Sequence, residues 1–70
     1  MKESVVNQVR ELRTDRGLTQ EELAALAGVS RQSVISIERG RYVPSLPLAL
    51  RLARIFACPV DVLFHLEDDR

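Results

Sequence analysis

Residues 19–40 read TQEELAALAGVSRQSVISIERG. Apolar residues recur at helical spacing in two short segments, residues 20–27 and 31–39, and only three residues separate the two. A turn this short makes two helices cross steeply, and the small side chain of Ala24 allows a close crossing. The stretch therefore predicts a helix-turn-helix, a motif whose second helix presents its N-terminal end to the edges of DNA bases.

The ends of both segments carry residues typical of helix boundaries. Thr19 suits an N-cap, and Glu22 three residues later completes a capping box. Ser30 suits the N-cap of the second segment. Gly28 and Gly40 stand just beyond the two C-termini, where glycine is favoured. The boundary residues and the apolar spacing therefore predict the same two helices.

The flanking sequence predicts three further helices. One spans about residues 4–16, one follows a capping Ser45, and a short one spans about residues 59–64. Residues 65–70 are expected to be either frayed or a short strand. The inward-facing residues, taken helix by helix, are expected to be Val5, Val9 and Leu12; Leu23, Ala24, Leu26 and Ala27; Val34 and Ile37; Leu48, Ala49, Leu52, Ala53 and Phe56; and Val60, Leu63 and Phe64. The sequence predicts an all-α fold of five helices.

Size and composition limit what the chain can be. Its 70 residues make one domain at most, over residues 1–70, and a chain this short is marginally stable unless it dimerises. A single cysteine excludes an internal disulfide bond and fits a reducing cytoplasm. We expect a cytoplasmic protein, because the sequence has neither a signal peptide nor an apolar segment long enough to span a membrane.

Charge is distributed unevenly although the formal net charge is zero. The middle of the chain holds five arginines, Arg31, Arg39, Arg41, Arg51 and Arg54, against one acid, Glu38. The end of the chain holds four acids, Asp61, Glu67, Asp68 and Asp69. Two interpretations stay open at this point: a polar molecule with one nucleic-acid face, or ordinary solvated charges.

Catalytic and metal-binding chemistry is not expected. A nucleophile needs a base and an orienting group within reach, and a metal needs several ligands, but the chain has one cysteine and one histidine. A glycine-rich phosphate loop is also missing from the sequence. We therefore expect no enzyme, cofactor, metal or small-molecule ligand. Cys58 is expected to be a small buried apolar residue, and His65 to lie on the surface or at the rim of a dimer.

The outward residues of the second helix of the pair are hydrogen-bonding or basic with one exception. They are Arg31, Gln32, Ser33, Ser36 and Arg39, and the exception is Ile35. Arginine can bind guanine, and glutamine can bind adenine, through two hydrogen bonds, each worth about 1–3 kcal/mol of discrimination. The isoleucine either contacts a thymine methyl group or is partly buried against its own helix.

The run LTQEELAALAGVSRQSVISIERGRYVPS, residues 18–45, resembles the phage-repressor and Cro class of helix-turn-helix regulators, the Xre family. The resemblance extends over residues 9–64, and the ending VDVLF is similar to that of short stand-alone dimeric repressors of bacteria. The positions that carry it are Gln20, Leu23, Ala24, Gly28, Val29, Ser30, Val34, Ile37, Glu38 and Gly40. It implies a five-helix, lambda-repressor-like DNA-binding domain.

The resemblance also implies roles for individual residues. Base edges would be contacted by Arg31, Gln32, Ser36 and Ile35, and the DNA backbone by Gln20, Ser30, Ser33, Arg39, Arg41 and Tyr42. Gln20 would also brace Gln32, and Arg13 and Glu38 would form a largely buried ion pair. Many family members have asparagine at the position of Arg39. The alternative is a solvated surface position for Gln20, Arg31, Gln32 and Ser36. For Tyr42 the alternative is packing of the ring on the domain edge.

The end of the chain has more apolar residues than its short helix can bury. Residues 60–66 hold five apolar side chains in seven positions, and exposed apolar patches often mark interfaces. In short repressors of the family the two termini can pair as a small sheet there. We expect an isologous dimer formed by Val62, Phe64 and Leu66, with Met1 and Val6 nearby. The alternative is a monomer in solution that dimerises only on the operator. Its recognition helices would lie about 34 Å apart on an inverted repeat of double-stranded DNA, with acidic residues 67–69 away from the DNA.

Two functions stay open. The first is a homodimeric repressor that binds an operator by itself. The second is an antitoxin that neutralises a partner toxin and regulates its own operon. The first is favoured, because antitoxins of this family commonly add a segment for the toxin and this sequence has almost nothing beyond the domain.

Overall fold

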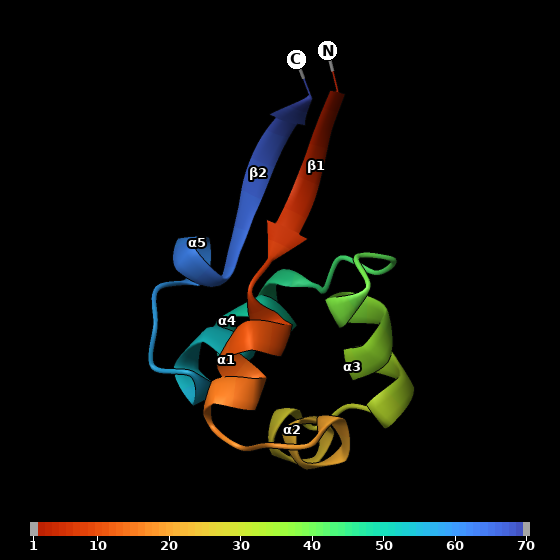
Figure 1. Cartoon of the computed structure of the whole chain (residues 1–70), viewed down its shortest axis with the longest axis vertical. Helices are drawn as coiled ribbons and strands as arrows, with labels where there is room; N and C mark the ends of the chain where they lie inside the picture. The colour runs from red at the N-terminus through yellow and green to blue at the C-terminus, as the bar shows by residue number, and fades with distance from the viewer. Residues whose placement is uncertain (1, 70) are drawn as a thin grey trace.

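Five helices and a two-stranded ribbon form the part of the chain that the computed structural model describes, which is the backbone of residues 2–69 and the side chains of residues 4–67. In chain order the elements are β1 (Lys2–Asn7), α1 (Val9–Asp15), α2 (Gln20–Ala27), α3 (Arg31–Glu38), α4 (Leu46–Ile55), α5 (Val60–Leu63) and β2 (Phe64–Asp69). The helices pack into one body, and the ribbon projects from it and carries both termini at its tip (Figure 1). The ribbon gives the molecule its length of 37 Å, against 23 and 22 Å in the other directions.

Local hydrogen bonds set the boundaries of α2 and α3. Thr19 Oγ1 accepts from the backbone N–H of Glu22 at 3.0 Å, and the Glu22 carboxylate accepts from the N–H of Thr19 at 2.8 Å. The predicted capping box is therefore present. Ser30 Oγ accepts from the N–H of Ser33 at 3.1 Å. Gly28 ends α2 with a φ of +73°, a left-handed conformation that allows the turn to α3 to be short.

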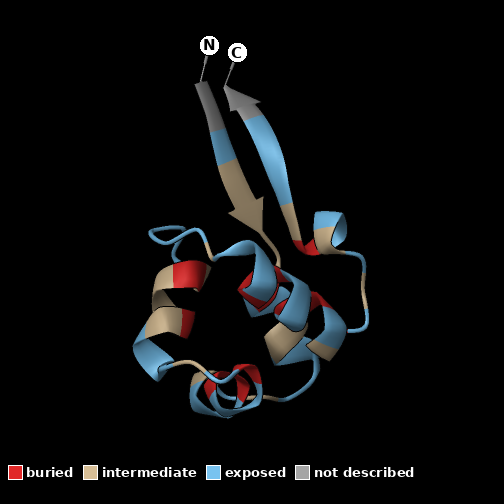
Figure 2. Ribbon diagram, turned by 180° about the vertical axis from the view of Figure 1, so that it is seen from behind, coloured by how far each residue is buried: buried red, intermediate tan, exposed pale blue. Residues whose placement is uncertain are grey.

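The core lies where the helices meet. Its largest fully buried side chains are Val9, Leu23, Val34, Ile37, Leu52 and Leu63, one or more from each helix. Figure 2 shows buried segments, in red, mainly on the sides of the helices that face one another, and exposed segments on the outer sides. Arg51 adds a polar tie, since its guanidinium donates to the Ala27 carbonyl at 2.9 Å and so links α4 to the end of α2.

The chain begins with a strand where the sequence predicts a helix. Residues 2–7 form β1, and α1 begins only at Val9, so Val5 is not part of a helical stripe. The side chain of Asn7 separates the two elements: its Oδ1 accepts from the N–H of Val9 at 3.1 Å and its Nδ2 donates to the Ile37 carbonyl at 3.0 Å. The backbone groups before it pair instead with β2, a partner from the other end of the chain.

The ribbon has two different faces. The strands pair antiparallel with Val5 opposite Leu66, Val6 opposite His65 and Asn7 opposite Phe64. Opposite residues share a face and faces alternate along a strand, so Val5, Phe64 and Leu66 lie on one face and Val6 and His65 on the other. This ribbon confirms the small terminal sheet that the family resemblance implies, and residues 65–69 belong to a strand.

Three details of the predicted core differ in the structure. Leu26 was expected inward but is 58% exposed, because the inward stripe of α2 consists of Leu23, Ala24 and Ala27 and Leu26 falls beside it. Cys58 packs against the core and is only partly buried. Helix α5 ends at Leu63, and Phe64, which is partly buried, already belongs to β2.

Candidate nucleic-acid interface

Helix α3 lies at one edge of the body and turns a polar face outward. Its inner residues Val34 and Ile37 are each 1% exposed, so the helix cannot rotate without opening the core. Arg31 and Gln32, at its N-terminal end, are exposed. Ser36 is half-buried one turn further along. The structure thus brings the predicted base-contacting residues to one outward face of a helix whose orientation is set by its packing.

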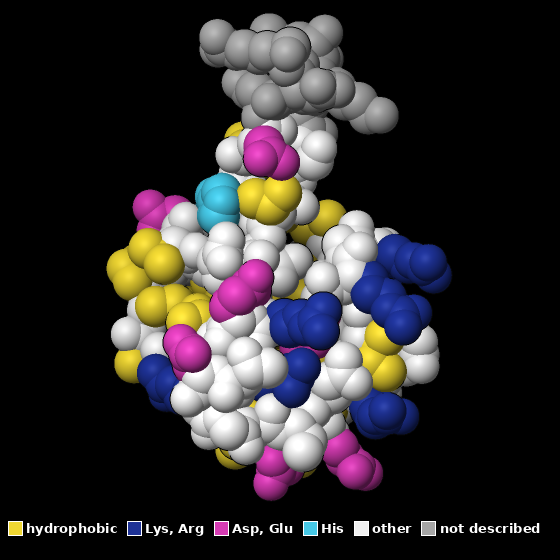
Figure 3. Space-filling view, viewed as in Figure 1, with side chains coloured by type: hydrophobic (Ala, Val, Ile, Leu, Met, Phe, Trp, Pro, Cys, Tyr) yellow, Lys and Arg dark blue, Asp and Glu magenta, His cyan; other side chains and the backbone are white. Residues whose placement is uncertain are grey.

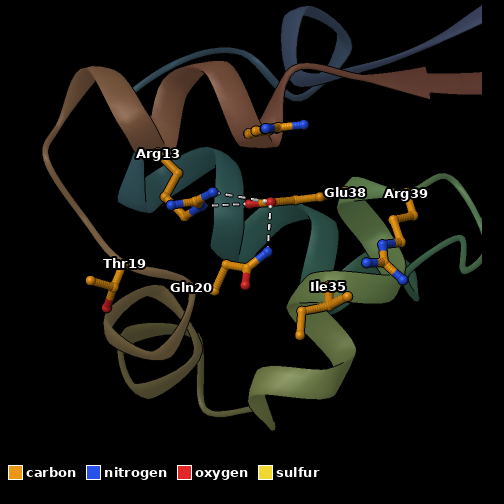
Figure 4. Close-up of a pocket in the computed structure, with 7 residues that line it drawn as sticks. Arg13, Thr19, Gln20, Ile35, Glu38 and Arg39 are labelled. Carbon is orange, nitrogen blue, oxygen red and sulfur yellow. Dashed lines mark hydrogen bonds and ion pairs between the residues drawn. The ribbon is translucent and has the colours of Figure 1, made fainter.

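An ion pair joins α3 to α1. Arg13 donates from Nε to Glu38 Oε2 at 2.6 Å and from Nη2 to Oε1 at 3.2 Å, and the two side chains are 12% and 4% exposed (Figure 4). Nη1 of the same guanidinium donates to the Leu18 carbonyl at 2.8 Å. The ion pair that the resemblance implies is present in the structure, and it also ties down the loop before α2.

Gln20 takes part in the same network, a contact that the sequence does not predict. Its Nε2 donates to Glu38 Oε1 at 3.2 Å (Figure 4). Within residues 4–67 its side chain makes no hydrogen bond to Gln32, so the expected brace between these two glutamines is not formed. An amide nitrogen carries two hydrogens, and the second one is left for another acceptor.

An open cleft of about 440 Å³ lies between α1, the start of α2 and the outer face of α3. Its lining residues are Arg10, Arg13, Thr19, Gln20, Ile35, Glu38 and Arg39. Ile35 is half-buried and lines this cleft, and Arg39 lies on the far side of Glu38 from Arg13 (Figure 4). Arg10 is not among the predicted contact residues, although its place three residues before Arg13 in a helix puts the two side chains on neighbouring positions of one face.

Basic side chains gather on the α3 side of the molecule and in the middle of the face seen in Figure 3. Arg31, Arg39 and Arg41 are exposed, and their guanidinium groups make no hydrogen bond or ion pair within the described side chains. Arg51, by contrast, is bonded to the α2 carbonyl of Ala27. Positive charge on and just after α3 is therefore available to a ligand.

The remaining predicted backbone contacts lie at the two ends of α3. Ser30 and Ser33 lie at its start, where their hydroxyl oxygens are 3.0 Å apart. Tyr42, which is 43% exposed, lies in the loop that follows the helix.

The expected dimer residues occupy the ribbon and α5. Val62 and Leu66 are 53% and 61% exposed, while Val6 and Phe64 are half-buried and Met1 lies outside the described residues. Phe64 and Leu66 line an apolar groove of about 300 Å³, together with Val5, Val43, Pro44, Leu46, Ala49, Val60 and His65. Val6 is not among the residues that line this groove.

Comparison with known proteins identifies the architecture. The family model HTH_3, helix-turn-helix, matches residues 9–63. The chain belongs to this family, which comprises the Xre and Cro/C1-type regulators. The match begins at the first residue of α1 and ends at the last residue of α5, so it includes every helix of the HTH_3 fold described above.

Several relatives match this HTH_3 chain over nearly its whole length. It is 50% identical over 62 residues to an HTH-type transcriptional regulator of Methanothermobacter thermautotrophicus, covering 87% of this chain and 90% of the relative. It is 46% identical over 63 residues to the regulator YgzD of Bacillus subtilis, covering 90% and 96%. Among solved structures it is similar to the restriction-modification controller protein C.AhdI of Aeromonas hydrophila, with 44% identity, a TM-score of 0.74 and coverage of 81% and 86%.

These relatives establish the broad function. This HTH_3 protein is a transcription regulator with a DNA-binding helix-turn-helix fold, and its family consists of DNA-binding proteins that are not enzymes. Within the described residues no helix is long and apolar enough to cross a membrane. The same part of the chain holds no group of three or more histidine, cysteine or acidic side chains that could bind a metal ion.

Proposed function

We propose that this chain is a homodimeric repressor that binds an inverted-repeat DNA operator through α3. The observation that carries the proposal is the pairing of a buried inner face of α3, Val34 and Ile37, with an exposed outer face that begins at Arg31 and Gln32. A reading helix needs both features, because its side chains must reach base edges while the helix itself is held in place. Arg31 and Gln32 are the side chains best placed to specify sequence.

Two further residues of α3 extend the proposed base contact. Ile35 is half-buried in the wall of the cleft, and the exposed part of its side chain suits an apolar contact with a thymine methyl group. Ser36 is half-buried on the same helix and reaches less far, so it contributes by a single hydrogen bond.

Contacts to the DNA backbone would flank the base contacts on both sides. Ser30 and Ser33 stand at the N-terminus of α3, where backbone N–H groups and the helix dipole favour a phosphate. Arg39, Arg41 and Tyr42 follow the C-terminal end of the helix and are exposed. Gln20 can add its second amide hydrogen from the start of α2. Such contacts position the protein on DNA without reading sequence.

The ribbon and the apolar groove support the dimer. An isolated two-stranded ribbon is marginally stable in water, and this one exposes Leu66 on the same face as Val5 and Phe64. Val62 on α5 is 53% exposed, and Leu46 at the start of α4, which lines the same groove as Leu66, is 67% exposed. A two-fold partner that covers this surface would bury these apolar residues and so stabilise the two-stranded ribbon. The dimer would place two α3 helices about 34 Å apart.

The proposal is tested by selecting bound sites from random double-stranded DNA and measuring the mass of the selected complex by sedimentation. We expect an inverted repeat with half-sites one helical turn apart, bound by two chains. Enrichment of single half-sites bound by one chain, or of no sequence at all, would contradict it. In a reporter assay, a promoter that overlaps the selected site should be transcribed less when the protein is expressed, and activation would contradict the repressor role.

A further inference from the structure

Arg10 is an exposed arginine on α1 that has no role in the fold described above. Its guanidinium makes no hydrogen bond or ion pair within the described side chains. By contrast, Arg13 of the same helix is bonded to Glu38, and Arg16, the C-cap residue of that helix, donates to the carbonyls of Ile55 and Phe56. Arg10 nevertheless lines the cleft beside α3. A cation at this position is therefore available to an external anion.

The cleft has a positive charge that its internal contacts do not cancel. It is lined by three arginines and one acid. The acid is Glu38, which is 4% exposed and accepts two hydrogen bonds from Arg13 and one from Gln20. Since Arg13 neutralises Glu38, the charges left over are those of Arg10 on one wall and Arg39 on another.

The same cleft is lined by α3 residues that the proposed function places against DNA. Ile35 and Arg39 are four residues apart and so lie on one face of the recognition surface. A DNA strand that follows this face passes the mouth of the cleft, and each nucleotide carries a phosphodiester anion. Arg10 then approaches the strand from α1, an element outside the helix-turn-helix.

We propose that Arg10 is a DNA-backbone contact and that it holds, together with Arg39, one phosphodiester at the mouth of the cleft. This inference rests on the proposed function, because it assigns a further contact to the same DNA-binding surface. It predicts that α1 takes part in affinity without taking part in sequence recognition. The other predicted contacts lie in the helix-turn-helix or directly after it, whereas Arg10 lies on α1. The Arg13–Glu38 pair joins α1 to α3.

The test compares Arg10→Ala, Arg10→Lys and the parent protein on two DNAs, the selected operator and a random duplex, over a series of salt concentrations. Arg54→Ala is the matched control, because Arg54 is an exposed arginine that does not line the cleft. Arg10→Ala should weaken binding to both DNAs by the same factor. Its plot of log K against log salt should be less steep by about 0.9 per protomer, or about 1.8 for a dimer. Arg10→Lys and Arg54→Ala should keep the parent slope.

The outcomes separate this inference from the function on which it rests. If the parent binds no DNA, the proposed function and this inference both fail. If the parent binds and Arg10→Ala keeps its salt slope, only the assignment of Arg10 fails. A thermal-unfolding titration with inorganic phosphate tests the alternative that the cleft binds a small free anion rather than a phosphate of DNA. Stabilisation of the parent but not of Arg10→Ala, with unchanged DNA slopes, would make the cleft a small-anion site and overturn the backbone contact.

Discussion

Arg13 of α1 and Glu38 of α3 form a nearly enclosed ion pair, with the carboxylate held by two hydrogen bonds of 2.6 and 3.2 Å. The pair connects the helix before the helix-turn-helix to the last turn of α3. Gln20 brings α2 into the same network through its bond to Glu38. Residues of α1, α2 and α3 therefore meet at one carboxylate, which adds a polar link to the packing of Val34 and Ile37 that holds α3 in place.

Replacing Glu38 with glutamine should destabilise the fold. The variant keeps the size of the side chain but leaves the Arg13 charge, which is 12% exposed, without its counterion. Breaking a buried pair on one side costs about 3–5 kcal/mol, so the free energy of unfolding should fall by an amount in or somewhat below that range. Urea denaturation measures it. Glu21→Gln is the control, because Glu21 is exposed and forms no ion pair within the described residues. Equal stability of the two variants would show that the pair contributes little.

Removing the N-cap of α3 should lower the stability of the fold by less than breaking the Arg13–Glu38 pair. Ser30→Ala deletes the oxygen that accepts from the Ser33 N–H at 3.1 Å, and loss of such a cap costs typically about 1 kcal/mol of stability. Ser30→Thr should keep the cap. Ser4→Ala serves as the control, since Ser4 is exposed and its hydroxyl makes no hydrogen bond among the described side chains. In thermal unfolding, the melting temperature of Ser30→Ala should lie below those of Ser30→Thr and Ser4→Ala. A melting curve of Ser30→Ala that coincides with that of Ser4→Ala would contradict the prediction.

Arg31 and Gln32 should affect sequence preference, whereas Arg41 should not. Alanine at either of the first two positions should weaken operator binding by about 1–3 kcal/mol and relax the selected consensus at one position. Arg41→Ala should weaken all duplexes alike and make the salt dependence less steep by about 0.9 per protomer. Selection of sites from random DNA with each variant distinguishes the two behaviours. An unchanged consensus for both Arg31→Ala and Gln32→Ala would remove them from the set of reading residues.

The dimer should depend on the exposed apolar face of the ribbon. Leu66 is 61% exposed, so Leu66→Asp should leave the monomer folded while placing a charge where the partner would pack. Leu26→Asp is a matched control, because Leu26 is 58% exposed and lies on α2, away from the groove. At micromolar concentration Leu66→Asp should sediment as a monomer and Leu26→Asp as a dimer. A folded Leu66→Asp that still sediments as a dimer would place the interface on another surface.

The sequence predicts the boundaries of α2 and α3 correctly but predicts a helix where β1 forms, because helix caps are local whereas strand pairing is not. A cap such as Thr19 or Ser30 bonds to a group three residues away, so the residues that decide the boundary are adjacent in the chain. The strand β1 depends on β2 at the opposite end of the chain, and a local pattern over residues 4–16 cannot reveal that partner. The exposure of Leu26 likewise follows from which face of α2 the other helices cover.

By itself, the sequence was enough to predict the helix-turn-helix, its boundaries and the outward residues of its second helix, because caps, glycines and apolar spacing act over a few residues. Only the tertiary structure brought Gln20 to Glu38 and placed Arg10 in a cleft opposite Arg39. Contacts of this kind join helices that are separate in the chain. Their geometry depends on how those helices cross, which is decided by the packing of Leu23, Val34 and Ile37 in a shared core.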